Sequence, residues 1–269
     1  EMYRREETFT WLMPAAEAIY RPFGFRFIYE KNKMTMTADV LQRAETDENW
    51  QIHSDQEVSG DIFCEEAKKE DLAELACFAE KQLSKLAEVY TVHDIAYFEQ
   101  RMQEVECEGG RLVLIRNENR ICGYFLALRE QREAWEIVVE NAVQKQAFPA
   151  VLRWLEAGRE KCTLTAFPKI WEQYAKSENV PAIMGRIVHL ERFVRCLKTK
   201  KEQEFKIRLT DSLIPENNGY FLIKTGAGGG TVTKAGNLSE KKEKMFRSLD
   251  IGQLTEELFR LSVFLNEVV

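Results

Sequence analysis

The sequence predicts an α/β unit in the middle of the chain, followed by an α+β unit. Three observations lead to this fold class. Within residues 56–183, segments of helical and strand periodicity alternate in an order typical of an α/β sandwich. After Lys198, three strand candidates precede a final helix. Before both units, residues 13–29 concentrate proline, tyrosine and phenylalanine, which suits a pocket lining and, for these residues taken alone, better suits a core strand and turn packed with aromatics than a loose terminus.

The first 40 residues predict a strand and a short helical turn. Residues 1–7 are mostly charged and indicate the end of a helix, and the apolar residues 8–13 predict a strand that Pro14 stops. Residues 16–23, AEAIYRPF, predict a helical turn. Between residues 25 and 40, the alternation of apolar and polar residues favours strands. The polar bridge QRAETDENWQIHSDQEVSG follows.

The middle unit opens with two predicted helices. After a strand-like start and an acidic first turn, the first helix places its apolar residues on one face: Leu72, Leu75, Ala76, Leu83, Leu86 and Ala87. Residues 93–105 predict the second helix. The elements that follow are a hairpin of strands 111–117 and 121–130, a strand at 134–142, a helix at 146–158 ended by Gly158, a strand at 162–167 and a helix at 168–176.

The last third of the chain predicts a three-stranded sheet and a helix. The strand candidates are residues 204–211, 219–225 and 230–236, joined by a turn-rich segment and by the glycine run GAGGG. Residues 249–261 predict a helix with an apolar stripe of Leu254, Leu258 and Leu261.

The composition limits the possible functions. With 45% hydrophobic residues, 30% charged residues and no apolar run of about 18 residues, the sequence is typical of a cytoplasmic protein of about two domains. A net charge of −6 argues against nucleic acid and anionic membranes as partners and suits a cationic substrate, although it also serves solubility alone. The six cysteines include no C-x-x-C pair and the three histidines stand far apart, so neither a disulfide framework nor a metal site is expected.

The glycine cluster KTGAGGGTVTK does not have the context of a phosphate-binding loop. Such a loop lies between a strand and a helix N-terminus, so that backbone N–H groups and the helix dipole converge on the phosphate. Here both flanks predict strands, which favours a flexible hairpin loop. The turn AVQKQAFPAVL in the middle unit lacks any glycine, and no Ser-His-Asp or Cys-His arrangement is visible.

The stretch FTWLMPAAEAIYRPFGFRFIYEK, residues 9–31, resembles the end of the first acetyltransferase domain in the enhanced intracellular survival family of bacterial GNAT N-acetyltransferases. The shared pattern is a strand, a turn of small residues and I-Y-x-x-F-G-[FY]. PAIMGRIVHLERFV, residues 181–194, is similar to the passage from that family's second, degenerate GNAT domain into a domain related to sterol carrier proteins. DSLIPENNGYFLIKT and LDIGQLTEELF are similar to segments of that last domain.

The resemblance implies three domains. Residues 1–55 would be the C-terminal remnant of a first GNAT domain with a linker, residues 56–183 the degenerate GNAT domain, and residues 184–269 the sterol-carrier-protein-like domain. The family's acetyl-CoA loop, R/Q-x-x-G-x-G/A before a helix, is absent from this sequence. The resemblance places it upstream of Glu1, so that the chain would be incomplete and would hold no cofactor-binding residues of its own.

The resemblance also implies an acetyl-CoA-dependent N-acetyltransferase that acts on aminoglycoside-like or lysine amines and assembles as a homo-oligomer. Tyr20 matches the family's general acid, and the C-terminal carboxylate of Val269 would be the general base. A phenol, protonated at neutral pH, can donate to the departing CoA thiolate, and an ionised carboxylate can take the proton of the amine. The apolar end LSVFLNEVV suits a buried terminus and equally an ordinary hydrophobic strand.

Two other interpretations stay open. The last domain could bind a lipid or sterol in an apolar tunnel, although its alternating strands favour a sheet with one wet face. The middle and last domains could instead serve only to build an oligomer, without catalysis. Co-purifying lipid would indicate the first, and the mass of the particle in solution tests the second.

Overall fold

The computed structural model divides the chain into two compact units. Unit 1 consists of residues 1–30 and 181–263, and unit 2 of residues 31–180 and 264–269. The residues that the structure describes are 1–37, 39, 43, 61–118, 120–130, 134–143, 147, 150–151, 153–154, 161–165, 175–236, 239–259 and 263–264. Unit 1 is therefore built from two segments that are far apart in the sequence.

Unit 2 contains a mixed sheet in the order β2-β8-β7-β6-β5-β3. Its strands are β2 (Arg26–Thr37, from Lys31 on), β3 (Ile62–Glu66), β5 (Arg111–Asn117), β6 (Arg120–Glu130), β7 (Ala134–Val143) and β8 (Lys161–Thr165). The β7–β8 pair is parallel, and the other pairs are antiparallel. The predicted hairpin and the strands after it are confirmed. The polar bridge and most residues of the helices predicted at 146–158 and 168–176 lie outside the described residues.

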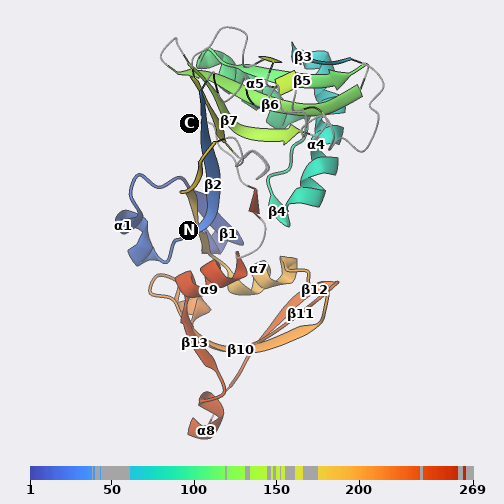
Figure 1. Cartoon of the computed structure of the whole chain (residues 1–269). Coiled ribbons are helices and arrows are strands. Elements are labelled where there is room, and N and C mark those ends of the chain that lie inside the picture. The colour runs from blue at the N-terminus through green and yellow to red at the C-terminus, as the bar shows by residue number, and fades with distance from the viewer. Residues whose placement is uncertain are drawn as a thin grey trace. The chain divides into compact units, whose positions relative to one another are not determined.

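Helices α4 (Leu72–Leu86) and α5 (Ile95–Cys107) pack against β5 and β6 (Figure 1). A short 3-10 turn, η3 (Lys69–Asp71), precedes α4, and β4 (Val89–Tyr90) lies between the helices. α5 begins at an Asp94 side chain that accepts a hydrogen bond from the Tyr97 N–H at 2.8 Å. The predicted face of the first helix is confirmed at Leu72, Leu75, Leu83 and Ala87, which are buried, and at Ala76, which packs against the core, whereas the side chain of Leu86 lies outside the described part. Buried residues of both helices form one core with the sheet: Leu72, Leu75, Ala79, Phe98, Val105, Leu112, Leu114, Tyr124 and Leu126.

In unit 1, strand β1 (Phe9–Leu12) pairs antiparallel with β9 (Ser177–Ile187), from Phe9 opposite Ile187 to Leu12 opposite Met184. The sequence did not predict β9, because its first residues are polar and Pro181 interrupts it. Helix α7 (Leu190–Cys196) follows directly. The charged start of the chain, where the sequence predicts the end of a helix, contains the 3-10 turn η1 (Tyr3–Arg5).

A four-stranded sheet in the order β12-β11-β10-β13 makes up the rest of unit 1. α7 and α9 lie along the same side of this sheet (Figure 1). Inward side chains such as Ile207 and Ile223 are buried, whereas Arg208 and Lys224 on the other face are exposed. The elements are β10 (Gln203–Thr210), η6 (Pro215–Asn217), β11 (Gly219–Gly226), β12 (Gly229–Lys234), α8 (Glu240–Glu243), β13 (Arg247–Asp250) and α9 (Ile251–Leu258). The short strand β14 (Val263–Phe264) lies where the chain passes from unit 1 to unit 2.

The end of this sheet differs from the prediction in one element. Leu249 and Asp250 belong to β13, which runs parallel to β10, so the predicted helix begins only at Ile251. Asp250 accepts a hydrogen bond from the Gln253 N–H at 2.8 Å, and the Gln253 side chain accepts one from the Asp250 N–H at 2.9 Å. This capping box satisfies two backbone donors and sets the start of α9.

An aromatic cluster joins the N-terminal segment to the later part of unit 1. The ring of Phe9 lies 6.0 Å from that of Phe193 in α7 and 5.5 Å from that of Phe259 after α9, and the latter two rings are 5.4 Å apart. Tyr3 stacks on His189 with ring centroids 4.5 Å apart. Aromatic pairs in such geometries stabilise beyond the area they bury. Phe9 and Tyr3 therefore pack against the later segment of unit 1.

Candidate functional site

Tyr20 closes α1 (Glu17–Tyr20), a single helical turn that passes directly into the 3-10 turn η2 (Arg21–Phe23). Its side chain is half-buried, and its ring meets the ring of Phe25 edge-on at 6.0 Å. Val269, the predicted general base, lies outside the described residues. The structure therefore places one of the two predicted site residues.

The turn that carries Tyr20, residues 16–25, follows from its sequence. Pro22 stands at the start of η2, where its fixed φ suits a helical turn and a missing N–H costs little. Gly24 ends η2 with a φ of 82°, which a residue with a side chain adopts at a cost. A Cβ atom on Gly24 would lie 2.7 Å from Cγ2 of Ile251 and 3.2 Å from Nε of Arg186. The backbone of the Tyr20 turn thus rests directly on α9 and β9.

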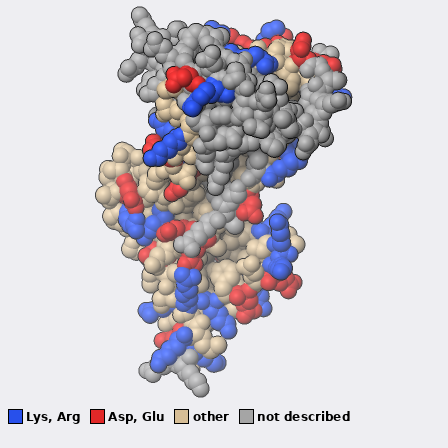
Figure 2. Space-filling model, viewed as in Figure 1, with Lys and Arg blue, Asp and Glu red and all other residues tan. Residues whose placement is uncertain are grey.

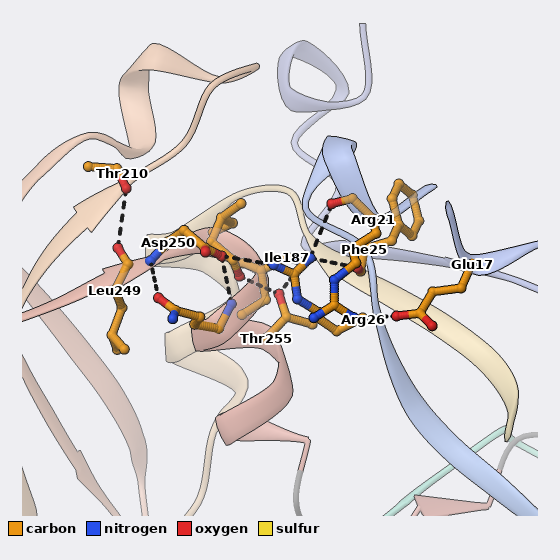
Figure 3. Close-up of polar contacts among 11 residues, drawn as sticks. Glu17, Arg21, Phe25, Arg26, Ile187, Thr210, Leu249, Asp250 and Thr255 are labelled. Atoms are coloured by element: carbon orange, nitrogen blue, oxygen red, sulfur yellow. Dashed lines mark hydrogen bonds and ion pairs between the residues drawn. The ribbon is translucent and has the colours of Figure 1, made fainter. Parts of the chain in front are cut away.

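The guanidinium of Arg26 lies beside this turn and makes polar contacts with three other residues (Figure 3). Its Nη1 donates to the carbonyl oxygens of Arg21 at 3.2 Å and of Phe25 at 2.8 Å, and its Nη2 lies 3.5 Å from Oδ1 of Asp250. The side chain of Arg26 is only 13% exposed. A Cβ atom on Gly252 would lie 2.5 Å from Cζ of Arg26, so the guanidinium occupies the space that the glycine leaves at the start of α9.

A second polar cluster lies beneath the same turn. Arg186 of β9 and Asp211 after β10 form a buried ion pair, with Nη2 2.6 Å from Oδ1. Oδ1 of Asp211 also accepts hydrogen bonds from the N–H groups of Leu213 and Ile214 at 3.0 and 3.1 Å, and Oδ2 accepts one from Asn217 at 2.9 Å. Among the described residues, the buried Nε of Arg186 has no hydrogen-bond partner.

Two asparagines extend this cluster to the backbone. Asn217 donates to the carbonyl of Val188 at 2.9 Å and accepts from the Leu190 N–H at 3.3 Å. Asn218 exchanges hydrogen bonds with the backbone N–H and C=O of Asp211 at 2.6 and 3.0 Å. The segment DSLIPENN therefore fixes the β9–α7 junction to the end of β10. The asparagines and the aspartate of this segment indicate a polar cluster from sequence alone. No feature of the sequence indicates that the ionic partner of Asp211 is Arg186.

The described cysteines of unit 2 that are withdrawn from solvent are poor nucleophiles. Burial raises the pKa of Cys64 to about 12 and that of Cys122 to about 11, and a thiol reacts through its thiolate.

In the described part of the chain, no group of three or more His, Cys, Asp and Glu side chains could hold a metal ion. No helix in that part has both the length and the apolarity to span a membrane.

On the face that Figure 2 shows, acidic and basic side chains are interspersed over the described residues. The glycine cluster forms the turn between β11 and β12, where Gly226 pairs with Gly229. The prediction of a hairpin loop is confirmed, and the geometry of a helix-capped phosphate loop is absent at this cluster.

Comparison with protein-family models gives no match, and no curated protein matches the chain. Solved structures do match. A GCN5-related N-acetyltransferase from Anabaena variabilis aligns at 17% identity with a TM-score of 0.71, over 96% of this chain and 65% of its own length. One from Kribbella flavida aligns at 13% identity with a TM-score of 0.70, over 96% and 62%.

Eis1 from Mycobacterium abscessus aligns at 13% identity with a TM-score of 0.61, over 95% of this chain and 63% of its own length. The chain thus spans less than two thirds of each of these structures. The fold, of mixed α and β content, matches that of GCN5-related N-acetyltransferase structures. Identities this low concern the fold alone.

Proposed function

We propose that this chain is part of an acetyl-CoA-dependent N-acetyltransferase that acts on amines. The observation that carries the proposal is the placement of Tyr20. It stands on the helical turn that follows strand β1 along the chain, on a fold that matches GCN5-related N-acetyltransferases. The I-Y-x-x-F-G motif at residues 19–24 supports the role of its phenol as general acid.

The proposed reaction needs two proton transfers. The amine nitrogen attacks the thioester carbonyl carbon, the C–S bond breaks, and the electron pair of that bond stays on the CoA sulfur. Tyr20 donates the phenolic proton to this thiolate, and the C-terminal carboxylate of Val269 accepts the proton that the amine loses. A positioned donor and a positioned acceptor each contribute about 10²–10⁴-fold to such a step.

The described residues fit only part of the acetyl-CoA site. Tyr20 supplies a donor for the sulfur, but the glycine cluster of the chain is a hairpin turn rather than a loop before a helix. We propose that residues 1–55 are the remnant of a first GNAT domain, the domain to which the resemblance assigns the loop for the pyrophosphate. Residues 56–183 and 184–269 are then the degenerate GNAT domain and the sterol-carrier-protein-like domain.

The test is release of free CoA thiol from acetyl-CoA with polyamines, lysine peptides and aminoglycosides as acceptors. The assay compares this chain with a version that carries the upstream region. Activity in the extended protein supports the proposal, and silence of both proteins across the panel contradicts it.

Tyr20→Phe in the active version tests the general acid. We expect kcat to fall by about 10² or more, because the phenyl ring keeps the contact with Phe25 but has no proton to donate. Tyr3→Phe is the matched control, since Tyr3 lies in the same unit and keeps its stacking on His189 without the hydroxyl. Unchanged turnover in Tyr20→Phe would remove Tyr20 from the mechanism.

The remaining expectations belong to the same proposal. The acceptor is a small-molecule or peptide amine, and the protein acts in the cytoplasm as a homo-oligomer without nucleic-acid or membrane partners. The lipid-carrier alternative receives no support from the open face of the C-terminal sheet, where Arg208 and Lys224 are exposed. Light scattering of the purified protein tests the oligomer.

A further inference from the structure

The Tyr20 turn, residues 16–25, has few means of holding its own position. α1 is one turn long, and its N-cap residue Ala16 makes no side-chain capping bond. Ile19 is 54% exposed and Phe23 is 48% exposed, so these two apolar side chains bury little area. Isolated helical turns of this length are unstable in water. The position of Tyr20 is therefore set by what packs against the turn from other elements.

These contacts come from the start of α9, more than 200 residues later in the chain. Ile251, which is 3% exposed, lies against Gly24, where a Cβ atom would come within 2.7 Å of it. Asp250 faces the guanidinium of Arg26 at 3.5 Å, and Gly252 leaves the room that this guanidinium fills. Three consecutive residues of the β13–α9 junction thus act on one turn.

Arg26 fixes the backbone of the Tyr20 turn through its hydrogen bonds. Its planar guanidinium can direct N–H groups to several acceptors at once, and here they reach the carbonyls of Arg21 and Phe25. The carbonyl of Arg21 belongs to the first residue after Tyr20, at the start of η2, and that of Phe25 lies just beyond the end of η2. An arginine beside the positive end of a helix is unfavourable, and the N-cap carboxylate of Asp250 offsets this cost.

We infer that Arg26 is a positioning residue for Tyr20, held against the turn by Asp250 and Gly252 at the N-terminus of α9. This inference rests on the proposed role of Tyr20 as general acid. Arg26 does not exchange a proton in the reaction. It sets where the phenol stands, and a displacement of about 1 Å at a reacting group can lower the rate by about 10².

Two variants disturb the contact between Arg26 and α9, one at each of its partners. Arg26→Gln removes the guanidinium, whereas Gly252→Ala leaves Arg26 intact and places a methyl group where its Cζ now lies. Alanine is a better helix former than glycine, so Gly252→Ala does not weaken α9 by propensity. Arg247→Gln is the matched control, because Arg247 is an exposed arginine of β13 that pairs with Glu257.

The first measurement is hydrogen exchange of residues 16–25 in this chain, which needs no activity. We expect exchange to become about tenfold faster in Arg26→Gln and in Gly252→Ala, with β10 and β11 unchanged, and no change in Arg247→Gln. Unchanged exchange of residues 16–25 in both variants would overturn the inference. Faster exchange throughout unit 1 would also overturn it, since Arg26 would then support the unit as a whole.

The second measurement is kinetic, in the version that shows activity. We expect kcat to fall about ten- to a hundredfold in both variants with KM for the amine unchanged, and Arg26→Lys to recover part of the loss. A rise in KM alone would contradict a positioning role. If Tyr20→Phe keeps full turnover, the proposed role of Tyr20 as general acid fails, while the exchange experiment still decides whether Arg26 positions the turn.

Discussion

Removal of Asp211 should destabilise unit 1 more than removal of its ionic partner Arg186. The pair is buried, with the Asp211 side chain 0% and the Arg186 side chain 5% exposed. The two partners differ in their other contacts. Asp211 accepts three further hydrogen bonds, whereas the structure gives the Arg186 side chain one acceptor, Asp211 itself, among the described residues.

The magnitudes follow from this asymmetry. Asp211→Ala leaves a guanidinium buried without a counter-charge, and since arginine cannot lose its proton, we expect a cost of about 3–5 kcal/mol in the free energy of unfolding. The freed N–H of Leu213 adds little, because that residue is 51% exposed and water reaches it. Arg186→Met fills much of the same space and leaves Asp211 with its three N–H donors, so we expect a cost of about 1–3 kcal/mol.

Native-state hydrogen exchange is the suitable assay, because a single unfolding midpoint is not well defined for a chain of two units. Amides of β10 and β11 report on unit 1, and those of β5 and β6 are the internal control in unit 2. Glu191→Ala is the matched control, since it removes an exposed carboxylate whose pair with Arg195 is worth about 0.5 kcal/mol at most. An Arg186→Met cost equal to or above that of Asp211→Ala would refute the reasoning.

Three further predictions test the packing and the thiols. Gly24→Ala should destabilise unit 1 by about 2–3 kcal/mol in the same assay, because it combines a φ of 82° with a clash against Ile251, and wild-type exchange would contradict this. Phe98→Ala should cost about 3–5 kcal/mol in unit 2 and nothing in unit 1, since the side chain is fully buried. Burial raises the pKa of Cys64 to about 12, so its thiolate should become abundant only near that pH. At pH 8, iodoacetamide should therefore modify it about 10³-fold more slowly than the exposed Cys77, as followed by peptide mass spectrometry, and similar rates would contradict the burial.

The elements that the sequence predicted correctly are those whose signal is local. The apolar spacing of α4 and the alternation in β10 and β11 depend only on how each element turns its side chains toward a core. The hairpin of β5 and β6 likewise needs two apolar runs and a short turn. Such patterns are complete within about 20 residues.

The elements that the sequence missed obtain their structure from distant partners. β9 begins with polar residues and contains Pro181, and its pairing with β1 brings together residues about 175 positions apart. β13 has four residues and pairs in parallel with β10, so in sequence it resembles the first turn of the helix that follows. Neither strand has enough pattern of its own to be distinguished from its surroundings.

The same distinction applies to the site. Tyr20 could be singled out because its motif is contiguous, and its role as general acid, like that of Val269 as general base, stays a prediction. Arg26 and Asp250 are separated by 224 residues, and each alone is an ordinary charged residue. Nothing in their local sequence indicates that they meet beside the Tyr20 turn.

This separation also determines which substitutions should affect the proposed reaction. A one-turn helix has no stability of its own, so the position of Tyr20 depends on the residues against which its backbone rests. In unit 1 these are Arg186 of β9 and the first residues of α9, all of them from the second segment of the unit. Changes at Ile251 or Gly252 should therefore alter turnover although neither residue carries chemistry. Changes at exposed positions nearer in sequence to Tyr20, such as Arg4, should not, because that side chain contacts none of these supports.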